Sequence, residues 1–465
     1  MVFSEPVFMF MFLPVTLLVY YAVPFRLKNA VLFLSGLLFY SWGEPVYVLI
    51  MILSTLIDYL AGRIMDKFEA NKKIRKAALI VSVVMNLSLL GLFKYSGFFI
   101  DSLNSAFGIS LYNPNLPLPI GISFFTFQSM SYTIDLYRKN ITVQKSFVKF
   151  AAFVTMFPQI VAGPIVLYND ISKELEERKI DFNALSDGIS TFICGLCKKV
   201  LIANSVGELW TTVKETDYST LPAATAWLGI IAFTLQIYFD FSGYSDMAIG
   251  LGKMLGFKFP ENFDYPYNSK SVSEFWRRWH MTLGGWFKSY VYFPLGGSKN
   301  GKGKTIRNLL IVWFLTGMWH GASWNFIIWG IYYGIILILE KFVFASVIKK
   351  LPSAVTRIYT LFAVIIGWVI FEITSPASEL GYIRAMFGFS GAFSDTFTIN
   401  ILHNYSIILI IAAITATGLP LKLWKKITSG KKLDGICIAG EAAGMAACIA
   451  YLVDATYNPF LYFNF

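Results

Sequence analysis

A histidine inside an apolar stretch is the residue in this chain best suited to chemistry. His320 lies within residues 316–326, where its neighbours are mostly apolar, aromatic or small. An imidazole at membrane depth is costly unless it faces a cavity or a partner, so we interpret His320 as a functional residue. Gly317 and Gly321 flank it and leave room for a substrate or for another backbone. The alternative is a histidine whose hydrogen bonds are satisfied inside a helix bundle.

A second histidine ends a segment rich in aromatic and basic residues. His280 follows the run Phe275-Trp276-Arg277-Arg278-Trp279. Tryptophan prefers the level of the lipid headgroups and arginine binds phosphate through two hydrogen bonds, so this segment is typical of a membrane interface. We expect Arg277, Arg278 and Lys288 to hold either the phosphates of a charged donor or lipid headgroups. Spacing alone does not separate these two interpretations.

General-base catalysis is the chemistry that suits the two histidines. An imidazole can take a proton from an acceptor hydroxyl while an ester or thioester carbonyl is attacked. We expect no metal site, because neither histidine has Asp, Glu or Cys beside it at ligand spacing. No Gly-x-Ser-x-Gly turn indicates a serine nucleophile. Cys194 and Cys197 form a C-x-x-C pair, which we interpret as helix packing, since a structural zinc needs four ligands.

The elements that carry these residues are predicted to be membrane helices. Hydrophobic residues make up 56% of the 465 positions and charged residues only 14%, whereas soluble domains are about a quarter charged. Apolar segments recur from residue 7 to residue 453, and several are shorter than the ~20 residues of a straight span. The sequence predicts an all-α polytopic membrane protein, with about eleven or more membrane helices plus re-entrant and interfacial helices. It forms a single membrane domain over 1–465.

The net charge of +11 is explained by where the basic residues lie. Lys and Arg gather in short loops beside apolar segments, which is the positive-inside pattern. We therefore expect contact with anionic membrane lipid and no nucleic acid. Placing these loops on the inner side puts the N- and C-termini on the outer face. The four loops are 63–76, 299–307, 341–350 and 422–432.

Four stretches, in order along the chain, resemble the membrane-bound O-acyltransferase family. The resemblance is closest to its bacterial polysaccharide O-acetyltransferase branch, of the alginate O-acetyltransferase kind. The matching stretches are Phe157-Pro158-Gln159-Ile160-Val161-Ala162-Gly163-Pro164-Ile165, Tyr238-Phe239-Asp240-Phe241-Ser242-Gly243-Tyr244-Ser245-Asp246-Met247-Ala248, Phe275-Trp276-Arg277-Arg278-Trp279-His280 and Met318-Trp319-His320-Gly321.

The resemblance implies a fold, a reaction and roles for particular residues. The fold is a helical bundle around a central funnel, in a bacterial cytoplasmic membrane. The family's catalytic histidine falls on His320 and its second polar position falls on His280. Acetyl-CoA enters from the cytoplasm, and an extracellular or cell-envelope polysaccharide is the final acceptor. We assign donor binding to Trp319 as well, beside Arg277, Arg278 and Lys288 already named.

The last six residues carry one further expectation. Residues 460–465 resemble the aromatic C-terminal motif of the same bacterial branch, in which a tyrosine holds the acyl group transiently. By this resemblance Tyr462 accepts acetyl with help from His320 and passes it to an extracellular partner of the SGNH hydrolase fold. A phenol is a modest nucleophile but a good leaving group for a second transfer. The alternative is an aromatic anchor at the level of the headgroups.

Two other functions stay open on the sequence alone. A transporter or flippase for a lipid-linked sugar fits broken helices and the acids Asp240 and Asp246 in an apolar stretch, although no inverted repeat is visible. Such acids must be paired or line a wet path. An acyltransferase that acts on lipid or protein is the second alternative.

Overall fold

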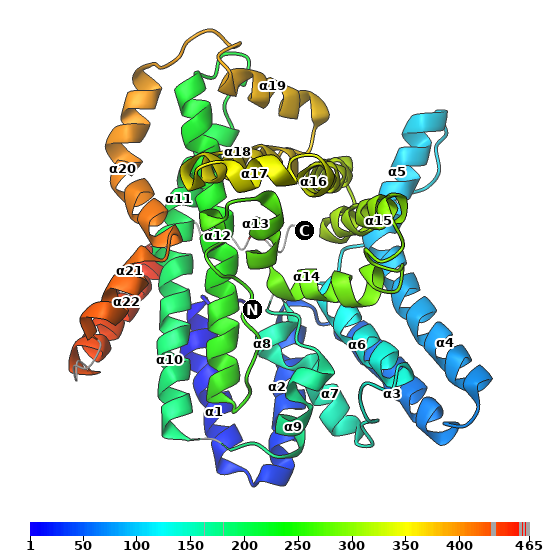
Figure 1. Ribbon diagram of the computed structural model, residues 1–465. Helices are drawn as coiled ribbons and strands as arrows, with labels where there is room; N and C mark the ends of the chain where they lie inside the picture. Colours follow the sequence, from blue (N-terminus) through cyan, green and yellow to red (C-terminus); the bar gives the residue numbers. More distant parts are fainter. Residues whose placement is uncertain (162, 180, 429–433, 455–457, 459–460, 462–465) are drawn as a thin grey trace. The chain divides into compact units, whose positions relative to one another are not determined.

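The computed structural model describes residues 1–161, 163–179, 181–428, 434–454, 458 and 461. Every regular element in these ranges is a helix, which confirms the predicted all-α class. Figure 1 labels these helices along the chain. The chain divides into two compact units. Unit 1 is Met1–Phe192 with Tyr244–Pro260, and unit 2 is Ile193–Gly243 with Glu261–Phe465. The single domain over 1–465 stays a prediction.

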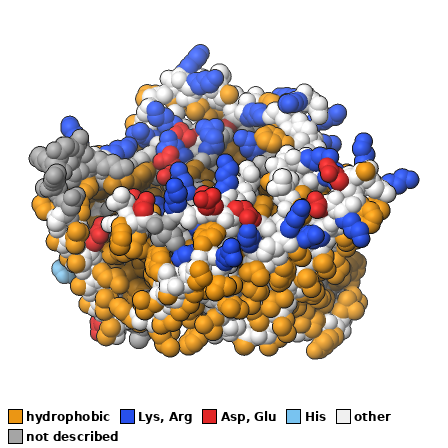
Figure 2. All heavy atoms as spheres, turned by 90° about the horizontal axis from the view of Figure 1, so that it is seen from below, with side chains coloured by type: hydrophobic (Ala, Val, Ile, Leu, Met, Phe, Trp, Pro, Cys, Tyr) orange, Lys and Arg blue, Asp and Glu red, His pale blue; other side chains and the backbone are white. Residues whose placement is uncertain are grey.

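The described helices include enough long apolar segments to make the protein polytopic, as predicted. Eight of them have the length and hydropathy to cross a membrane, and the shorter Phe8–Ala22 is also apolar. The count of eleven or more stays a prediction. Figure 2 shows that apolar side chains cover a continuous area of one face, while Lys and Arg gather outside it. The eight are Val48–Lys67, Lys72–Phe107, Phe182–Lys214, Ala223–Met254, Trp324–Phe342, Ser353–Glu372, Thr396–Ala416 and Gly435–Asp454.

Unit 1 begins with the membrane helices of the N-terminal half. Proline and asparagine mark the breaks between them: Pro24 precedes α2, and the Asn71 side chain accepts from the Lys73 and Ile74 N–H groups at the start of α4. The helices are η1 (Phe8–Phe12), α1 (Leu13–Ala22), α2 (Phe25–Gly43), α3 (Val48–Lys67), α4 (Lys72–Leu90), η2 (Gly91–Tyr95), α5 (Ser96–Phe107), α6 (Ile122–Tyr137), α7 (Phe147–Thr155), α8 (Phe157–Ile160), α9 (Tyr168–Glu176) and most of α10 (Phe182–Cys197).

Helices α3, α4 and α6 pack against one another in unit 1. Asp58 of α3 is fully buried between them, and its carboxylate accepts from Ser82 at 2.5 Å and from Asn86 at 2.9 Å. A buried carboxylate is retained only with such donors. All residues of α6 from Ile122 to Thr133 are buried, so this short helix is covered by protein, as irregular segments at membrane depth must be.

Unit 2 contains the short helices between the two long apolar regions and the C-terminal helices. Its elements are the end of α10, η3 (Lys198–Ala203), α11 (Asn204–Lys214), most of α12 (Ala223–Met254), η4 (Pro266–Asn268), α13 (Val272–Arg278), α14 (Met281–Phe287), η5 (Lys288–Tyr292), α15 (Lys302–His320), α16 (Trp324–Phe342), α17 (Ala345–Lys350), α18 (Ser353–Glu372), α19 (Pro376–Met386), α20 (Thr396–Ala416), α21 (Leu419–Thr428) and α22 (Asp434–Asp454).

Burial differs strongly among the membrane helices. Protein covers 78% of the most apolar window of α12 but only 6% of that of the last span, Gly435–Asp454. In unit 2, α15 packs against α16, α16 against α18, and α13 against both α16 and α18. His320 ends α15 of this group, and α13 leads to His280.

Candidate active site

The short helix α13 carries the arginine pair and leads to His280. Its first turn is capped by Ser271, whose hydroxyl accepts from the Glu274 N–H at 3.0 Å. The buried carboxylate of Glu340, on α16, accepts from the Val272 N–H at 2.7 Å and the Ser273 N–H at 2.8 Å. Glu340 therefore satisfies the free N–H groups of α13 and fixes this helix against α16.

His280 sits between α13 and α14 in a left-handed conformation, with φ 43° and ψ 55°. This conformation costs about 1–3 kcal/mol for a residue other than glycine and persists only where neighbours impose it. Asn262 is the neighbour that does so. Its backbone oxygen accepts from the Met281 N–H at 2.9 Å, and its side-chain oxygen accepts from the Thr282 N–H at 3.2 Å and the Thr282 hydroxyl at 2.9 Å.

The same side-chain oxygen of Asn262 lies 3.0 Å from Nδ1 of His280. A backbone N–H can only donate, so its bond to Asn262 identifies Oδ1 as an acceptor there. His280 therefore carries its proton on Nδ1 and keeps the lone pair on Nε2. Only 2% of the residue is exposed, and this burial lowers the pKa of His280 to about 3. The ring is neutral at physiological pH.

His320 is the last residue of α15 and is 4% exposed. Aromatic rings surround its imidazole: those of Trp329 and Phe371 lie nearly perpendicular to it, with centroids 5.0 Å and 5.2 Å away. Asn325 donates to the Phe371 carbonyl at 2.7 Å and so ties the start of α16 to the end of α18. The imidazole of His320, at the end of α15, is thus packed against side chains of α16 and α18.

Glycines bring α15 and α16 into backbone contact at this site. A β-carbon at Gly317 would lie 2.3 Å from the Phe326 carbonyl oxygen. A β-carbon at Gly321 would lie 2.2 Å from the Phe326 ring. The sequence left open whether the two glycines make room for a substrate or for another backbone. The structure shows that α16 occupies the space beside both Gly317 and Gly321.

Trp319 joins the two histidines. Its ring centroid lies 5.9 Å from that of His280 and 5.1 Å from that of His320. Phe241 of α12 also packs against His280, with its ring perpendicular at a centroid distance of 4.7 Å. The structure therefore brings together three of the predicted site residues in unit 2, although His280 and His320 come from separate helices.

The predicted donor-binding cations have different surroundings. Arg278 forms ion pairs with Asp264 at 3.2 Å and with Glu274 at 2.9 Å. Arg277 is exposed, and Lys288 is exposed with its ammonium 5.6 Å from the ring of Phe293. Arg277 and Lys288 are consequently the two whose charges are not used in ion pairs among the described residues.

Tyr462, the third histidine of the chain (His403) and the C-x-x-C cysteine Cys197 lie away from the histidine site or outside the described residues. Tyr462 is outside the described residues. His403 is exposed on α20. Cys197 packs against Cys448, with the sulfurs 3.7 Å apart, in keeping with a packing role. In the described part of the chain, no group of three or more His, Cys, Asp and Glu side chains converges on a point where a metal could bind.

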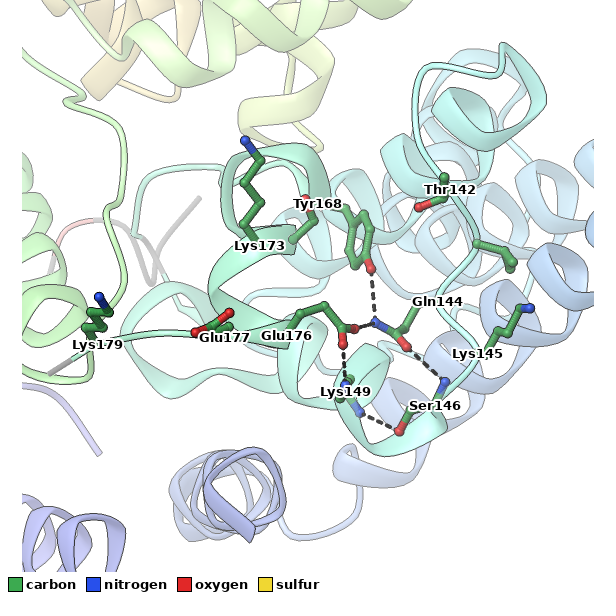
Figure 3. Close-up of a pocket in the computed structure, with 12 residues that line it drawn as sticks. Thr142, Gln144, Lys145, Ser146, Lys149, Tyr168, Lys173, Glu176, Glu177 and Lys179 are labelled. Atoms are coloured by element: carbon green, nitrogen blue, oxygen red, sulfur yellow. Dashed lines mark hydrogen bonds and ion pairs between the residues drawn. The ribbon is translucent and has the colours of Figure 1, made fainter. Parts of the chain in front are cut away.

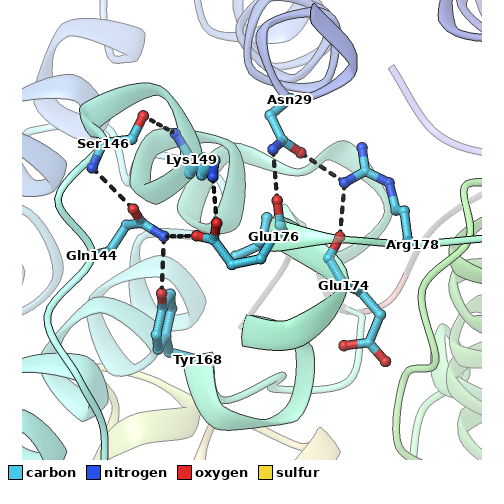
Figure 4. Close-up of polar contacts among 9 residues, drawn as sticks. Asn29, Gln144, Ser146, Lys149, Tyr168, Glu174, Glu176 and Arg178 are labelled. Atoms are coloured by element: carbon cyan, nitrogen blue, oxygen red, sulfur yellow. Dashed lines mark hydrogen bonds and ion pairs between the residues drawn. The ribbon is translucent and has the colours of Figure 1, made fainter. Parts of the chain in front are cut away.

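A polar pocket of about 960 Å³ opens in unit 1, between the segment 142–149 and helix α9 (Figure 3). Gln144 donates to Tyr168 at 3.1 Å and to Glu176 at 2.9 Å (Figure 4). Hydrogen bonds from Lys149 and Gln144 hold the pKa of Glu176 below its usual range. The described residues that line this pocket include none of the predicted site residues.

Sequence reasoning missed two residues that position the site. Asn262 was visible only as part of an aromatic, proline-containing segment, and nothing in that segment shows that it turns back onto His280. Glu340 lies at the end of an apolar helix, where a lone acid is a signal that a buried donor is near. That signal was present but does not identify α13 as the partner.

Comparison with known proteins shows which family the chain resembles and which relatives it has. The model of the MBOAT, membrane-bound O-acyltransferase, family matches residues 38–378. The chain is 39% identical over 393 residues to a probable alginate O-acetylase of Pseudomonas aeruginosa, covering 84% of this chain and 75% of that protein. It is 32% identical over 427 residues to the peptidoglycan O-acetyltransferase of Helicobacter pylori, covering 84% and 80%. A teichoic acid D-alanyltransferase of Bacillus subtilis is 30% identical over 272 residues, covering 54% and 66%.

Proposed function

The chain belongs to the membrane-bound O-acyltransferase family, and we propose that it moves acetyl from cytoplasmic acetyl-CoA across the membrane to O-acetylate an extracellular or cell-envelope polysaccharide. Membership in this family makes the protein an O-acyltransferase rather than a transporter. The names of its relatives, an alginate O-acetylase and a peptidoglycan O-acetyltransferase, support acetyl as the group and a polysaccharide as the acceptor.

The observation that carries the proposal is that the rings of His280 and His320 both lie against the ring of Trp319, with centroids 5.9 Å and 5.1 Å from it. Both imidazoles are buried among aromatic rings, which keep bulk water away from the reacting groups. We assign general-base catalysis to His320. His280, held neutral with its lone pair on Nε2, accepts a hydrogen bond and so orients a hydroxyl or amide group of a substrate.

The proposed transfer balances as follows. The acceptor hydroxyl gives its proton to the His320 imidazole while its oxygen attacks the thioester carbonyl. The C–S bond breaks, an ester forms, and the imidazolium returns the proton to the departing thiolate of CoA. We assign support of the charged intermediate to two indoles. The Nε1 atoms of Trp276 and Trp329 are buried and have no acceptor among the described residues, so each can donate to the carbonyl oxygen.

Donor binding is assigned to Trp319 and to the cations of the segment 277–288. Arg277 and Lys288 carry charges that are not used in ion pairs among the described residues, which suits them to the phosphates of acetyl-CoA. Arg278 would have to exchange a carboxylate partner to do the same. Lipid headgroups are the competing ligands for these side chains.

A relay through Tyr462 completes the proposal. His320 activates the phenol, the phenol accepts acetyl, and an extracellular partner of the SGNH hydrolase fold takes the acetyl to the polysaccharide. This order requires the C-terminus on the outer face of a bacterial cytoplasmic membrane. The positive-inside distribution of the basic loops supports that orientation.

The test uses the full chain in lipid nanodiscs with radiolabelled acetyl-CoA, followed by mass spectrometry of the C-terminal peptide. Wild type is compared with His320→Ala and Tyr462→Phe, and the exposed third histidine supplies the control variant His403→Ala. We expect acetyl on Tyr462 in wild type and His403→Ala, and a loss of at least about 100-fold in His320→Ala.

Three outcomes would contradict parts of the proposal. CoA release that needs His320 while Tyr462→Phe stays fully active would remove the relay and leave the tail as an interfacial anchor. Release that does not depend on His320 with any acyl-CoA would remove the catalytic assignment. Labelled lipid or protein in place of polysaccharide, when cell envelopes are added, would favour the other class of acceptor.

A further inference from the structure

A buried ion pair in unit 2 is not used by the chemistry described above. Asp240 of α12 and Lys199 of η3 lie 2.7 Å apart, and both side chains are only 2% exposed. Lys199 also donates to the side-chain oxygen of Asn204 at 2.8 Å. We call Lys199, Asp240 and Asn204 the tail cluster. Charges in such surroundings are costly and mark sites with a function more often than sites of simple packing.

A close approach of two backbones builds this cluster. A β-carbon at Gly243 would lie 2.7 Å from the Gly195 carbonyl oxygen and 3.1 Å from the Lys199 backbone nitrogen. The glycine therefore lets η3 lie directly against α12, one turn from Asp240. At this distance the Lys199 ammonium reaches the Asp240 carboxylate without leaving the interior.

The cluster does not end with its own three members, because the C-terminal segment (458–465) contacts it at both described positions. The backbone N–H of Leu461 donates to Oδ2 of Asp240 at 3.0 Å. The side-chain nitrogen of Asn204 donates to the side-chain oxygen of Asn458 at 3.2 Å. Leu461 is itself buried. An ion pair that served only to join α12 to η3 would need neither contact.

Helix α22 delivers this segment but is itself held by few contacts. Only 6% of its apolar window is covered by protein. Tyr451 donates to Glu208 at 2.9 Å, and Cys448 packs on Cys197. Beyond residue 454, Asn458 and Leu461 add polar contacts to Asn204 and Asp240.

The tail cluster and the histidine site share α12. Phe241 follows Asp240 directly in the sequence, and its ring packs perpendicular to that of His280. Leu461, whose N–H donates to Asp240, is the residue immediately before Tyr462 in the sequence. The carboxylate of Asp240 therefore connects the end of the chain to the helix that supports His280.

We propose that the tail cluster is a receptor site for the chain's own C-terminal segment. It recognises the segment by the Leu461 N–H and the Asn458 side chain, and it positions the segment for acyl transfer. Lys199, Asp240 and Asn204 are positioning residues and do not touch the reacting atoms. The positioning role rests on the proposed function; the docking itself does not.

The test measures hydrogen exchange of a C-terminal peptide containing Leu461, by mass spectrometry on the full chain in nanodiscs. Lys199→Met combined with Asp240→Leu replaces the pair by apolar side chains of similar volume, a change that buried ion pairs often tolerate. Asn458→Ala removes the contact from the side of the tail and leaves the bundle unaltered. The matched control removes another ion pair of unit 2, Lys214 with Glu372, as Lys214→Met with Glu372→Leu.

We expect slow exchange of the tail in wild type and in the control. In the double variant of the tail cluster, exchange becomes about 10- to 100-fold faster, the range for losing a hydrogen bond to a charged group. Asn458→Ala raises it less, by about 3- to 10-fold. Acetyl on Tyr462 falls in parallel in both, while the KM for acetyl-CoA stays unchanged.

Three results would overturn the inference. These are a wild-type tail that exchanges as fast as an unprotected chain, a tail that stays slow in both variants, and a released tail with undiminished acetyl transfer. Failure of the proposed function has a different signature. In that case His320→Ala leaves acetyl transfer intact, while the wild-type pattern of tail exchange is retained.

Discussion

The strongest test of the candidate active site is to change Asn262, because one oxygen atom of this residue holds three groups around His280. In Asn262→Ala, the His280 Nδ1–H, the Thr282 N–H and the Thr282 hydroxyl all lose their acceptor. A buried donor left without an acceptor costs about 1–3 kcal/mol. The ring and backbone donors cannot rotate away, so about 2–6 kcal/mol disfavours the left-handed turn. A loss of about 3 kcal/mol corresponds to about 100-fold in kcat.

Asn262→Asp separates positioning from charge. The aspartate has the same shape and accepts the same hydrogen bonds, so the turn is retained, but it adds a negative charge beside the imidazole. Burial lowers the pKa of His280 to about 3 in the wild type. A neighbouring carboxylate raises a histidine pKa by about 1–3 units, which brings the pKa of His280 to about 4–6.

The direction of the pH effect follows from the proton on His280. Protonation removes the lone pair on Nε2, so activity is lost as pH falls through the pKa of the ring. In the wild type, His280 contributes no such loss above about pH 4. In Asn262→Asp, the rate falls between about pH 6 and pH 4, while at about pH 8 it stays near that of the wild type.

The assay is the initial rate of CoA release from acetyl-CoA by the protein in nanodiscs, from about pH 4.5 to pH 8. Asn115→Asp adds the same charge at an exposed loop position outside the membrane-spanning helices and serves as the control. If Asn262→Asp kept the pH profile of the wild type, the Asn262 oxygen would not face the protonated Nδ1. If Asn262→Ala kept its kcat, the turn would not matter for catalysis.

Two further predictions concern packing and donor binding. In Gly317→Ala the new methyl group meets a carbonyl oxygen of α16 at 2.3 Å, so we expect the melting temperature to fall by about 4 °C or more. In Gly303→Ala, on the same helix, the new methyl group meets nothing within 4 Å, so the melting temperature should stay unchanged. Equal falls in melting temperature for the two variants would contradict the close approach of α15 and α16. Arg277→Ala with Lys288→Ala should raise the KM for acetyl-CoA about 3- to 10-fold at constant kcat. The increase in KM should be smaller when the donor is 3′-dephospho-acetyl-CoA. An unchanged KM for acetyl-CoA in the double variant would leave lipid headgroups as the ligands of these side chains.

Much of the fold followed from the sequence because membrane burial acts locally. Each apolar stretch of sufficient length becomes a helix whose backbone groups bond within the segment, whatever its neighbours are. The stretches near 30–42 and 45–61 became α2 and α3, and only their ends moved. His320 was predictable for the same reason, since an imidazole in an apolar run is expensive wherever the run packs.

Other features depended on which distant residues meet. The sequence showed that Asp240 needs a partner or a wet path, but only the tertiary structure identified Lys199 and the end of the chain. The flanking glycines of His320 were open to two interpretations until α16 occupied both positions. Asn262 was unremarkable until its turn brought it against His280.

The physical reason is the range of the interactions involved. Transfer of side chains into an apolar phase and hydrogen bonding within a helix are nearly additive along the chain. Composition and periodicity therefore predict the helices and single out the rare polar residues that are candidates for function. Pairing of buried charges, close contact of glycines and the orientation of an imidazole arise only when separate elements pack in one arrangement. These tertiary contacts decided how the two histidines meet and where the tail binds.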